Sequence, residues 1–143
     1  MNTQIDVGIQ TELERVTAVS DANPQAGAVI VRGSEILSVG SAKKTLSGMS
    51  IADEPVLLIH AEEAALMDAL ARQVDIAGAD MYVLLRRGNG EIRHTDGSYS
   101  CIVCSRLLKQ TTIKNVVYPT SQRWESITVQ AMFEKAIERI GNK

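Results

Sequence analysis

The chain has 143 residues, a formal charge of −2 and 45% apolar residues, which is ordinary for a globular protein. That length supports one hydrophobic core, so we expect a single domain over residues 1–143. The apolar runs are short and the N-terminus has no apolar signal segment, so the sequence predicts neither a membrane span nor secretion. Two cysteines three residues apart indicate reduced thiols in the cytoplasm rather than a disulfide framework.

The charged residues are distributed unevenly along the chain. Residues 1–85 carry 5 basic and 12 acidic side chains, whereas residues 86–123 carry 7 basic and 2 acidic ones. The basic segment contains both cysteines, and it is either a solvated face or the contact for a phosphate. The acidic balance of the whole chain disfavours a broad nucleic-acid interface.

The N-terminal half predicts a helix over residues 1–20 and a β-hairpin with strands over 26–31 and 36–39. Apolar residues recur at a helical period up to Val16, and Thr11 with Glu14 would form a capping box. β-branched residues fill both strands, and Gly33 lies in the turn between them. Residues 41–55 show no clear period and predict a loop.

The C-terminal half predicts helices over 60–77, 101–110 and 126–140 and strands over 81–85 and 116–118. Alanine and leucine fill the first of these helices, which we expect to end at Gly78. Leu107 and Leu108 face inward in the short helix, and Ile127–Val129 is a poor candidate for a fifth strand. This order of elements implies an α/β fold, a three-layer α/β/α sandwich around a mixed sheet of about five strands.

Two short motifs carry the chemistry. His60-Ala61-Glu62 stands at one predicted helix start, and Cys101-Ile-Val-Cys104 begins 39 residues after Glu62 at another. One imidazole and two thiolates suit a catalytic zinc, which keeps its fourth position open for water. Glu62 is then placed to move protons for that water.

Other readings of the same residues stay open at this point. His60 alone could be a buried core histidine, and the cysteine pair alone could be a redox motif. His94 could complete a closed site with the cysteines and His60, which would make the zinc structural. The joint occurrence of both motifs, in this order and both at helix starts, favours the catalytic zinc.

The segments HAEEAAL, SCIVCSRLL and IKNVVY, with the hairpin NPQAGAVIV…EILSVG, resemble the zinc-dependent cytidine and deoxycytidylate deaminase superfamily over roughly residues 20–120. The resemblance implies a cytidine deaminase-like fold, with Zn²⁺ held by His60, Cys101 and Cys104. It assigns Glu62 as the acid/base that shuttles protons while a zinc hydroxide attacks the amine-bearing ring carbon and ammonia leaves. It also implies a homodimer or a higher homo-oligomer.

The candidate substrate contacts are Asn23, Ala61, Arg93, Ser100 and Trp124. Ser100 replaces the proline that precedes the first cysteine in the family, and Ser41-Ala42-Lys43 offers no counterpart of the family's ribose-binding asparagine. Asn23 could equally be a turn residue and Trp124 a core residue. The polar excursion over 86–99 is either a hairpin flap over the pocket or a plain surface loop.

The leading hypothesis is a hydrolase that deaminates a small cytosine-type nucleoside or nucleotide. One alternative keeps the chemistry but changes the substrate to a purine base or to a base in RNA or single-stranded DNA. An alternative from another class is a non-catalytic binding module that uses zinc only for stability.

Overall fold

The computed structural model describes residues 5–22, 25–45, 57–87, 92, 108, 111–120 and 123–141. The helices are α1 (Val7–Ala18), α2 (Ala61–Ala71) and α4 (Val129–Gly141). The strands are β1 (Gln25–Arg32), β2 (Glu35–Ser41), β3 (Lys43–Thr45), β4 (Leu57–Ile59), β5 (Asp80–Arg86), β6 (Asn115–Pro119) and β7 (Trp124–Thr128).

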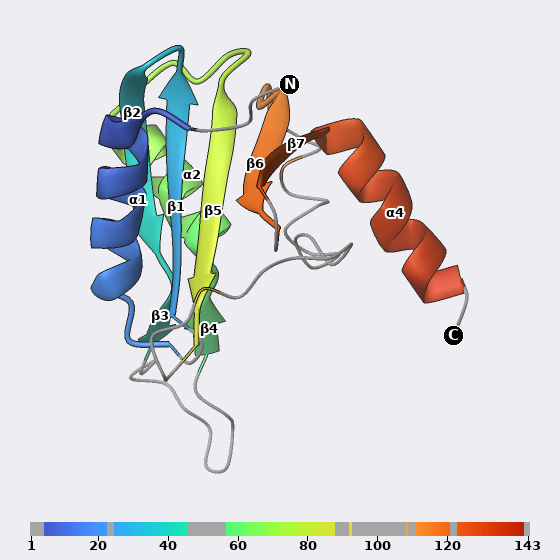
Figure 1. The fold of residues 1–143 in the computed structure, drawn as a ribbon, viewed down its shortest axis with the longest axis horizontal. Coiled ribbons are helices and arrows are strands. Elements are labelled where there is room, and N and C mark those ends of the chain that lie inside the picture. Colours follow the sequence, from blue (N-terminus) through green and yellow to red (C-terminus); the bar gives the residue numbers. More distant parts are fainter. Residues whose placement is uncertain are drawn as a thin grey trace.

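A five-stranded mixed sheet with the order β2-β1-β5-β6-β7 forms the centre of the molecule (Figure 1). β1 runs antiparallel to β2 and β5, β5 and β6 are parallel, and β7 returns antiparallel to β6. The carboxyl ends of β2, β5 and β6 therefore meet at one edge of the sheet. The mixed sheet of five strands confirms the predicted α/β class.

Helices cover the sheet on both faces. α1 lies in front of the sheet in Figure 1 and α2 behind it. The α1 face holds a core cluster formed by Ile9, Leu13, Val16, Val29, Val31 and Leu84. The core on the α2 face includes Ala28, Ile30, Ala61, Ala65, Met81 and Val116. Two apolar layers, one on each face, are what the predicted α/β/α sandwich requires.

The first helix begins at a different residue from the predicted one. Asp6 is its N-cap, and the Asp6 carboxylate accepts hydrogen bonds from Gly8 N at 2.8 Å and Ile9 N at 3.3 Å. Thr11 and Glu14 lie inside the helix, so the predicted capping box is wrong. Aspartate suits this position because its short carboxylate reaches the unpaired N–H groups of the first turn.

The helix predicted over 60–77 ends earlier, at the last residue of α2. Gln73 adopts a left-handed conformation with φ 56°. Its N–H donates to Leu70 O at 3.1 Å, and Val74 N donates to Ala69 O at 2.9 Å. This pair of bonds is a Schellman motif. The prediction of a later end is wrong because a glutamine occupies the position where glycine is usual.

Two strands occupy segments that were predicted otherwise. The fifth strand is β7, which includes Ile127 and Thr128 of the segment that the sequence marked as a poor candidate, and the last helix begins at Val129 rather than at residue 126. β3 lies inside the predicted loop over 41–55 and pairs with β4 as a separate two-stranded sheet.

The segment predicted as a short helix over 101–110 is described at one residue. Leu108 is helical there and fully buried in the core of the α2 face, as predicted; Leu107 lies outside the described residues. Arg86, the last residue of β5, forms an antiparallel bridge with Ile92. Among the helices in the described ranges, none is both long and apolar enough to cross a bilayer.

Candidate active site

The turn that carries the histidine and glutamate lies at the start of α2, as predicted. His60 is the N-cap, with φ −72° and ψ 152°, and its carbonyl accepts the first helical bond from Ala64 N at 2.9 Å. The His60 side chain makes no capping bond to the helix. His60 and Glu62 are both half-buried. The imidazole is therefore not used to begin the helix, and Glu62 follows two residues later in the first turn.

The two short strands join this turn to the end of β2. Lys43 pairs with Ile59, so His60 follows directly beside the residue that links β2 and β3, Ala42. Figure 1 shows β3 and β4 at the lower end of the sheet, where β5 also ends. In open α/β sheets, this carboxyl edge of the parallel strands is where ligands bind.

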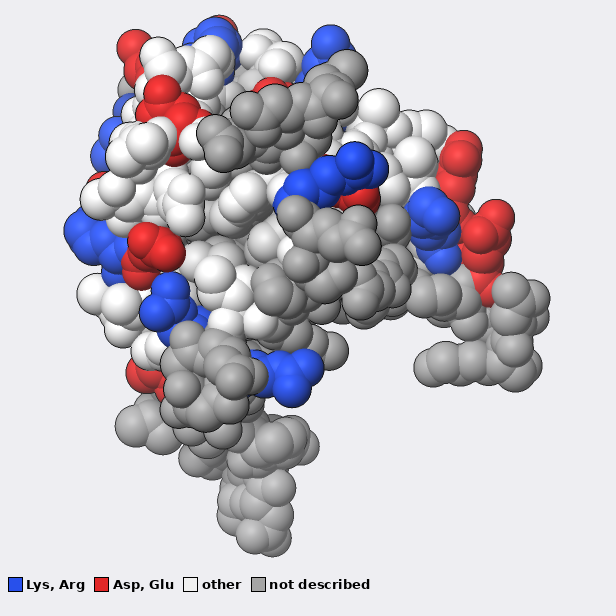
Figure 2. Space-filling view, viewed as in Figure 1, with Lys and Arg blue, Asp and Glu red and all other residues white. Residues whose placement is uncertain are grey.

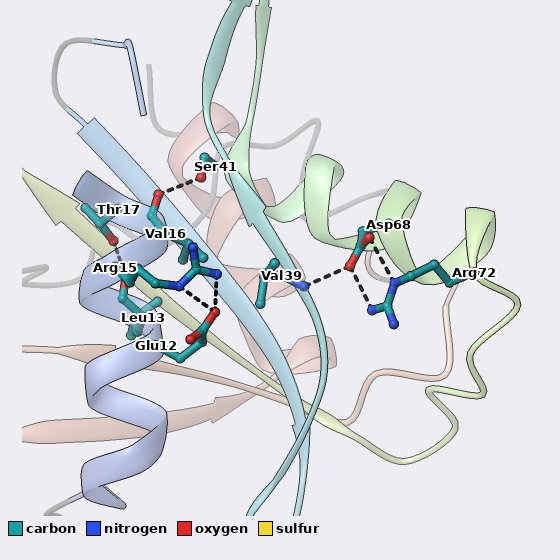
Figure 3. A network of polar contacts seen from close by, with 9 residues as sticks. All are labelled: Glu12, Leu13, Arg15, Val16, Thr17, Val39, Ser41, Asp68 and Arg72. Atoms are coloured by element: carbon teal, nitrogen blue, oxygen red, sulfur yellow. Dashed lines mark hydrogen bonds and ion pairs between the residues drawn. The ribbon is translucent and has the colours of Figure 1, made fainter. Parts of the chain in front are cut away.

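Serine hydroxyls fix the backbone at the same edge. Ser20 Oγ donates to Ala42 O at 2.7 Å and accepts from Ala26 N at 3.2 Å. Ser41 Oγ donates to Val16 O at 2.5 Å, which ties the end of β2 to the end of α1 (Figure 3). These bonds give backbone groups of the segment beside His60 their partners.

A stripe of alanines lets α2 lie close to the sheet. Ala61, Ala65 and Ala69 recur every four residues and are all nearly fully buried. The Ala61 side chain is 1% exposed and packs in the core. The predicted substrate contact of Ala61 would therefore use its backbone. Glu62 and Glu63 lie in the first turn, where acidic side chains interact favourably with the helix dipole.

The donor set fits zinc by its chemistry. His60 would supply one imidazole nitrogen from a helix start, and Cys101 with Cys104 would supply two thiolates, leaving one position for water. The two cysteines lie outside the described residues, and among those described no group of three potential ligands gathers. Asn23, Arg93, Ser100 and His94 also lie outside them.

Trp124 is described, and it lies away from α2. It begins β7 and packs, partly buried, against the core cluster on the α1 face of the sheet. The structure thus gives Trp124 the contacts of a core residue and does not bring it together with His60. Its stacking on a base stays a prediction.

A match to a known family identifies the family to which the chain belongs. A family model described as the cytidine and deoxycytidylate deaminase zinc-binding region matches residues 9–120. The chain belongs to this family. The match confirms the predicted zinc cofactor and the predicted hydrolytic deaminase for cytosine nucleosides or nucleotides. It does not test the individual site residues.

Solved structures of this fold are similar over nearly the whole chain. The dCMP deaminase of the cyanophage S-TIM5, solved in complex with dCMP and dUMP, is 21% identical, with a TM-score of 0.59 and coverage of 93% of this chain and 95% of that one. A cytidine deaminase from Burkholderia pseudomallei is 19% identical, with a TM-score of 0.63 and coverage of 90% and 96%. At these identities the likeness shows the fold. No curated protein sequence matches the chain.

Sequence reasoning missed three residues that hold α2 in place. Gly40 lies in β2 against the first turn of α2, and Asp68 and Arg72 contact the backbone of β2. Two signals were present in the sequence. A glycine inside a strand often marks a close backbone approach, and aspartate with arginine four residues later forms a helical ion pair.

Proposed function

We propose that this protein hydrolytically deaminates a free cytosine nucleoside or nucleotide at the turn that carries His60 and Glu62. The observation that carries the proposal is their placement in one helix start, at the edge where the parallel strands end. His60 would bind zinc together with Cys101 and Cys104. When bound, zinc supplies the Lewis acidity that makes water a nucleophile near neutral pH.

Glu62 moves the protons of the reaction. Its carboxylate takes one proton from the attacking water and passes it to the ring nitrogen, then carries the second proton of that water to the exocyclic amine, so ammonia leaves and the ring keeps the water oxygen as a carbonyl. The backbone of α2 holds this carboxylate in the first turn next to the His60 ligand. Both residues are half-buried, so substrate reaches them while bulk water is partly excluded.

A small substrate suits the charge of the molecule better than a nucleic acid does. Figure 2 shows the molecule from the same side as Figure 1, and over the described part of this side Lys and Arg side chains are interspersed with Asp and Glu. A duplex or single strand is usually bound along a continuous cationic track. The formal charge of −2 supports the same choice.

The test compares two neighbouring glutamates in the zinc-loaded protein. We expect Glu62→Gln to keep its zinc and to release ammonia from cytidine, deoxycytidine, CMP or dCMP at least about 100-fold more slowly than the unmodified protein. Glu63→Gln changes the same charge in the same turn, and we expect its rate to stay within a few-fold.

The outcomes separate the competing functions. Ammonia release from adenine, guanine or an oligonucleotide, with none from the cytosine compounds, would replace the proposal by the purine or nucleic-acid alternative. Full zinc occupancy without turnover on any of these compounds would identify a non-catalytic zinc module instead.

We propose further that residues 1–143 form one domain and that the enzyme works as a homo-oligomer in the cytoplasm. Support for the oligomer comes from the outer face of α2, where Met67 is 54% and Leu70 is 80% exposed. Large apolar side chains grouped on one exposed face favour association. The two thiols needed for zinc support a reducing compartment.

A further inference from the structure

β2 approaches the start of α2 closely beneath the turn that carries His60 and Glu62. A Cβ atom built on Gly40 would lie 2.2 Å from Ala65 N, 2.6 Å from Ala61 O and 2.7 Å from the Ala64 carbonyl carbon. All three are backbone atoms of the start of α2, so no flexible side chain can move aside. Glycine is therefore the one residue that β2 can carry here while α2 keeps its present position.

A second attachment joins the later turns of α2 to the same strand. Asp68 Oδ2 accepts from Val39 N at 3.1 Å (Figure 3). Arg72 donates to Leu37 O at 2.6 Å. Arg72 also pairs with Asp68 at 2.9 Å. β2 is an edge strand, so these bonds use backbone groups that no neighbouring strand pairs.

Together the two attachments fix the distance of α2 from the sheet and the position of α2 along β2. Gly40 sets how close the first turn lies to the sheet, and the Asp68–Arg72 pair prevents the helix from sliding along the strand. We infer that Gly40, Asp68 and Arg72 are positioning residues for His60 and Glu62. The inference rests on the proposed function, since it takes those two residues as the zinc ligand and the proton carrier.

The size of the effect follows from the distances. Ordinary contact of a Cβ atom begins at 3.4 Å, and the Gly40 site offers 2.2 Å, so Gly40→Ala requires a shift of about 1.2 Å between β2 and the start of α2. A misplacement of about 1 Å at a reacting centre can cost about 100-fold in rate. We therefore expect Gly40→Ala to lower kcat by about 100-fold.

Gly27 provides a matched control on the other face of the sheet. A Cβ atom there would lie 2.4 Å from Thr17 Oγ1 and 2.7 Å from Thr17 N, so Gly27→Ala is as crowded but pushes on α1. Both variants should lower Tm. At a temperature where both are folded, we expect only Gly40→Ala to lose kcat, to release zinc more readily to a chelator, and to alter the absorption spectrum of bound Co²⁺.

The inference is overturned if folded Gly40→Ala matches Gly27→Ala in kcat, zinc retention and Co²⁺ spectrum. If Gly40→Ala does not fold, Asp68→Ala replaces it, with Glu12→Ala as control because the Glu12–Arg15 ion pair joins two residues within α1. We expect Asp68→Ala to lower zinc affinity and kcat by about 10-fold with KM unchanged, and Glu12→Ala to change neither.

Equal behaviour of Asp68→Ala and Glu12→Ala would overturn the inference as well. A failure of the proposed function is distinguishable from this result. If the unmodified protein deaminates none of the cytosine compounds, the zinc affinity and the Co²⁺ spectrum of the same variants still report whether α2 has moved its metal ligand.

Discussion

Ser20, which follows α1, and Ser38, in β2, are both buried. Replacing each by alanine should change the free energy of unfolding in opposite directions. Ser20 is 4% exposed, and its hydroxyl donates to Ala42 O at 2.7 Å and accepts from Ala26 N at 3.2 Å. Ser38 is 1% exposed, and its Oγ has no hydrogen-bond partner in the described part of the chain. Replacing each serine by alanine therefore removes a satisfied hydroxyl in one case and an unsatisfied one in the other.

The expected magnitudes follow from these partners. Ser20→Ala leaves the buried Ala42 carbonyl, the buried Ala22 N–H and the part-buried Ala26 N–H without this partner, and a buried group costs about 1 to 3 kcal/mol when unsatisfied. We expect a loss of about 2 to 3 kcal/mol in the free energy of unfolding. Ser38→Ala relieves the burial of an unpaired hydroxyl, and we expect a gain of about 1 kcal/mol.

Urea unfolding of the zinc-loaded protein, monitored by circular dichroism, measures both values. An unchanged m-value would show that the two variants unfold from equally compact states. For a domain near this size, 1 kcal/mol shifts Tm by about 4 °C, so the two variants should differ by about 12 °C or more. A Ser38→Ala variant that is destabilised, or a Ser20→Ala variant as stable as the unmodified protein, would refute the reasoning.

Two further predictions concern charge and association. The hydrogen bond from Arg72, with a further contribution from Val39 N–H, lowers the pKa of Asp68 below 3.8 against an opposing effect of burial. A lowered pKa stabilises the fold above pH 3.8 and loses that effect as pH falls through the folded value, so acidification from about pH 5 to pH 3 should lower Tm more in the unmodified protein than in Asp68→Asn. Leu70→Glu should shift the zinc-loaded protein toward monomer in light scattering. Val7→Glu, at a similarly exposed position (78%) on α1, should not. Equal masses for the two variants would contradict an oligomer interface on α2.

The sheet could be predicted where burial and local turn chemistry agree. The hairpin of β1 and β2 has β-branched residues in both strands and turns at Gly33, whose φ of 64° glycine adopts without strain. β7 could not be predicted in the same way. It is an edge strand in which Ser126 and Thr128 are exposed, and α4 begins at the next residue. The short alternation of exposed and partly buried residues in β7 therefore cannot be separated in the sequence from the helical periodicity of α4.

The chemically active residues of the site could be predicted from the sequence, but the contacts that hold them in place could not. The spacing of His60 and Glu62 at a helix start is a local pattern, and the structure confirms that start. The contact of Gly40 with Ala65 depends on how β2 and α2 pack, which no local pattern contains. The same holds for β3 and β4, whose pairing joins segments that are separated along the chain.

The topology explains why the support lies on β2 in particular. β2 is the edge strand nearest to α2, and both its end and the ends of β5 and β6 point to the edge where His60 stands. An edge strand has unpaired backbone groups on its outer side, and α2 uses them through Asp68 and Arg72. The helix that bears the chemistry is thus held by an edge strand, through backbone groups that no other strand pairs. A sequence that keeps the two motifs but carries a larger residue at position 40 should fold with its ligands displaced, so the motifs specify a deaminase site only together with this strand.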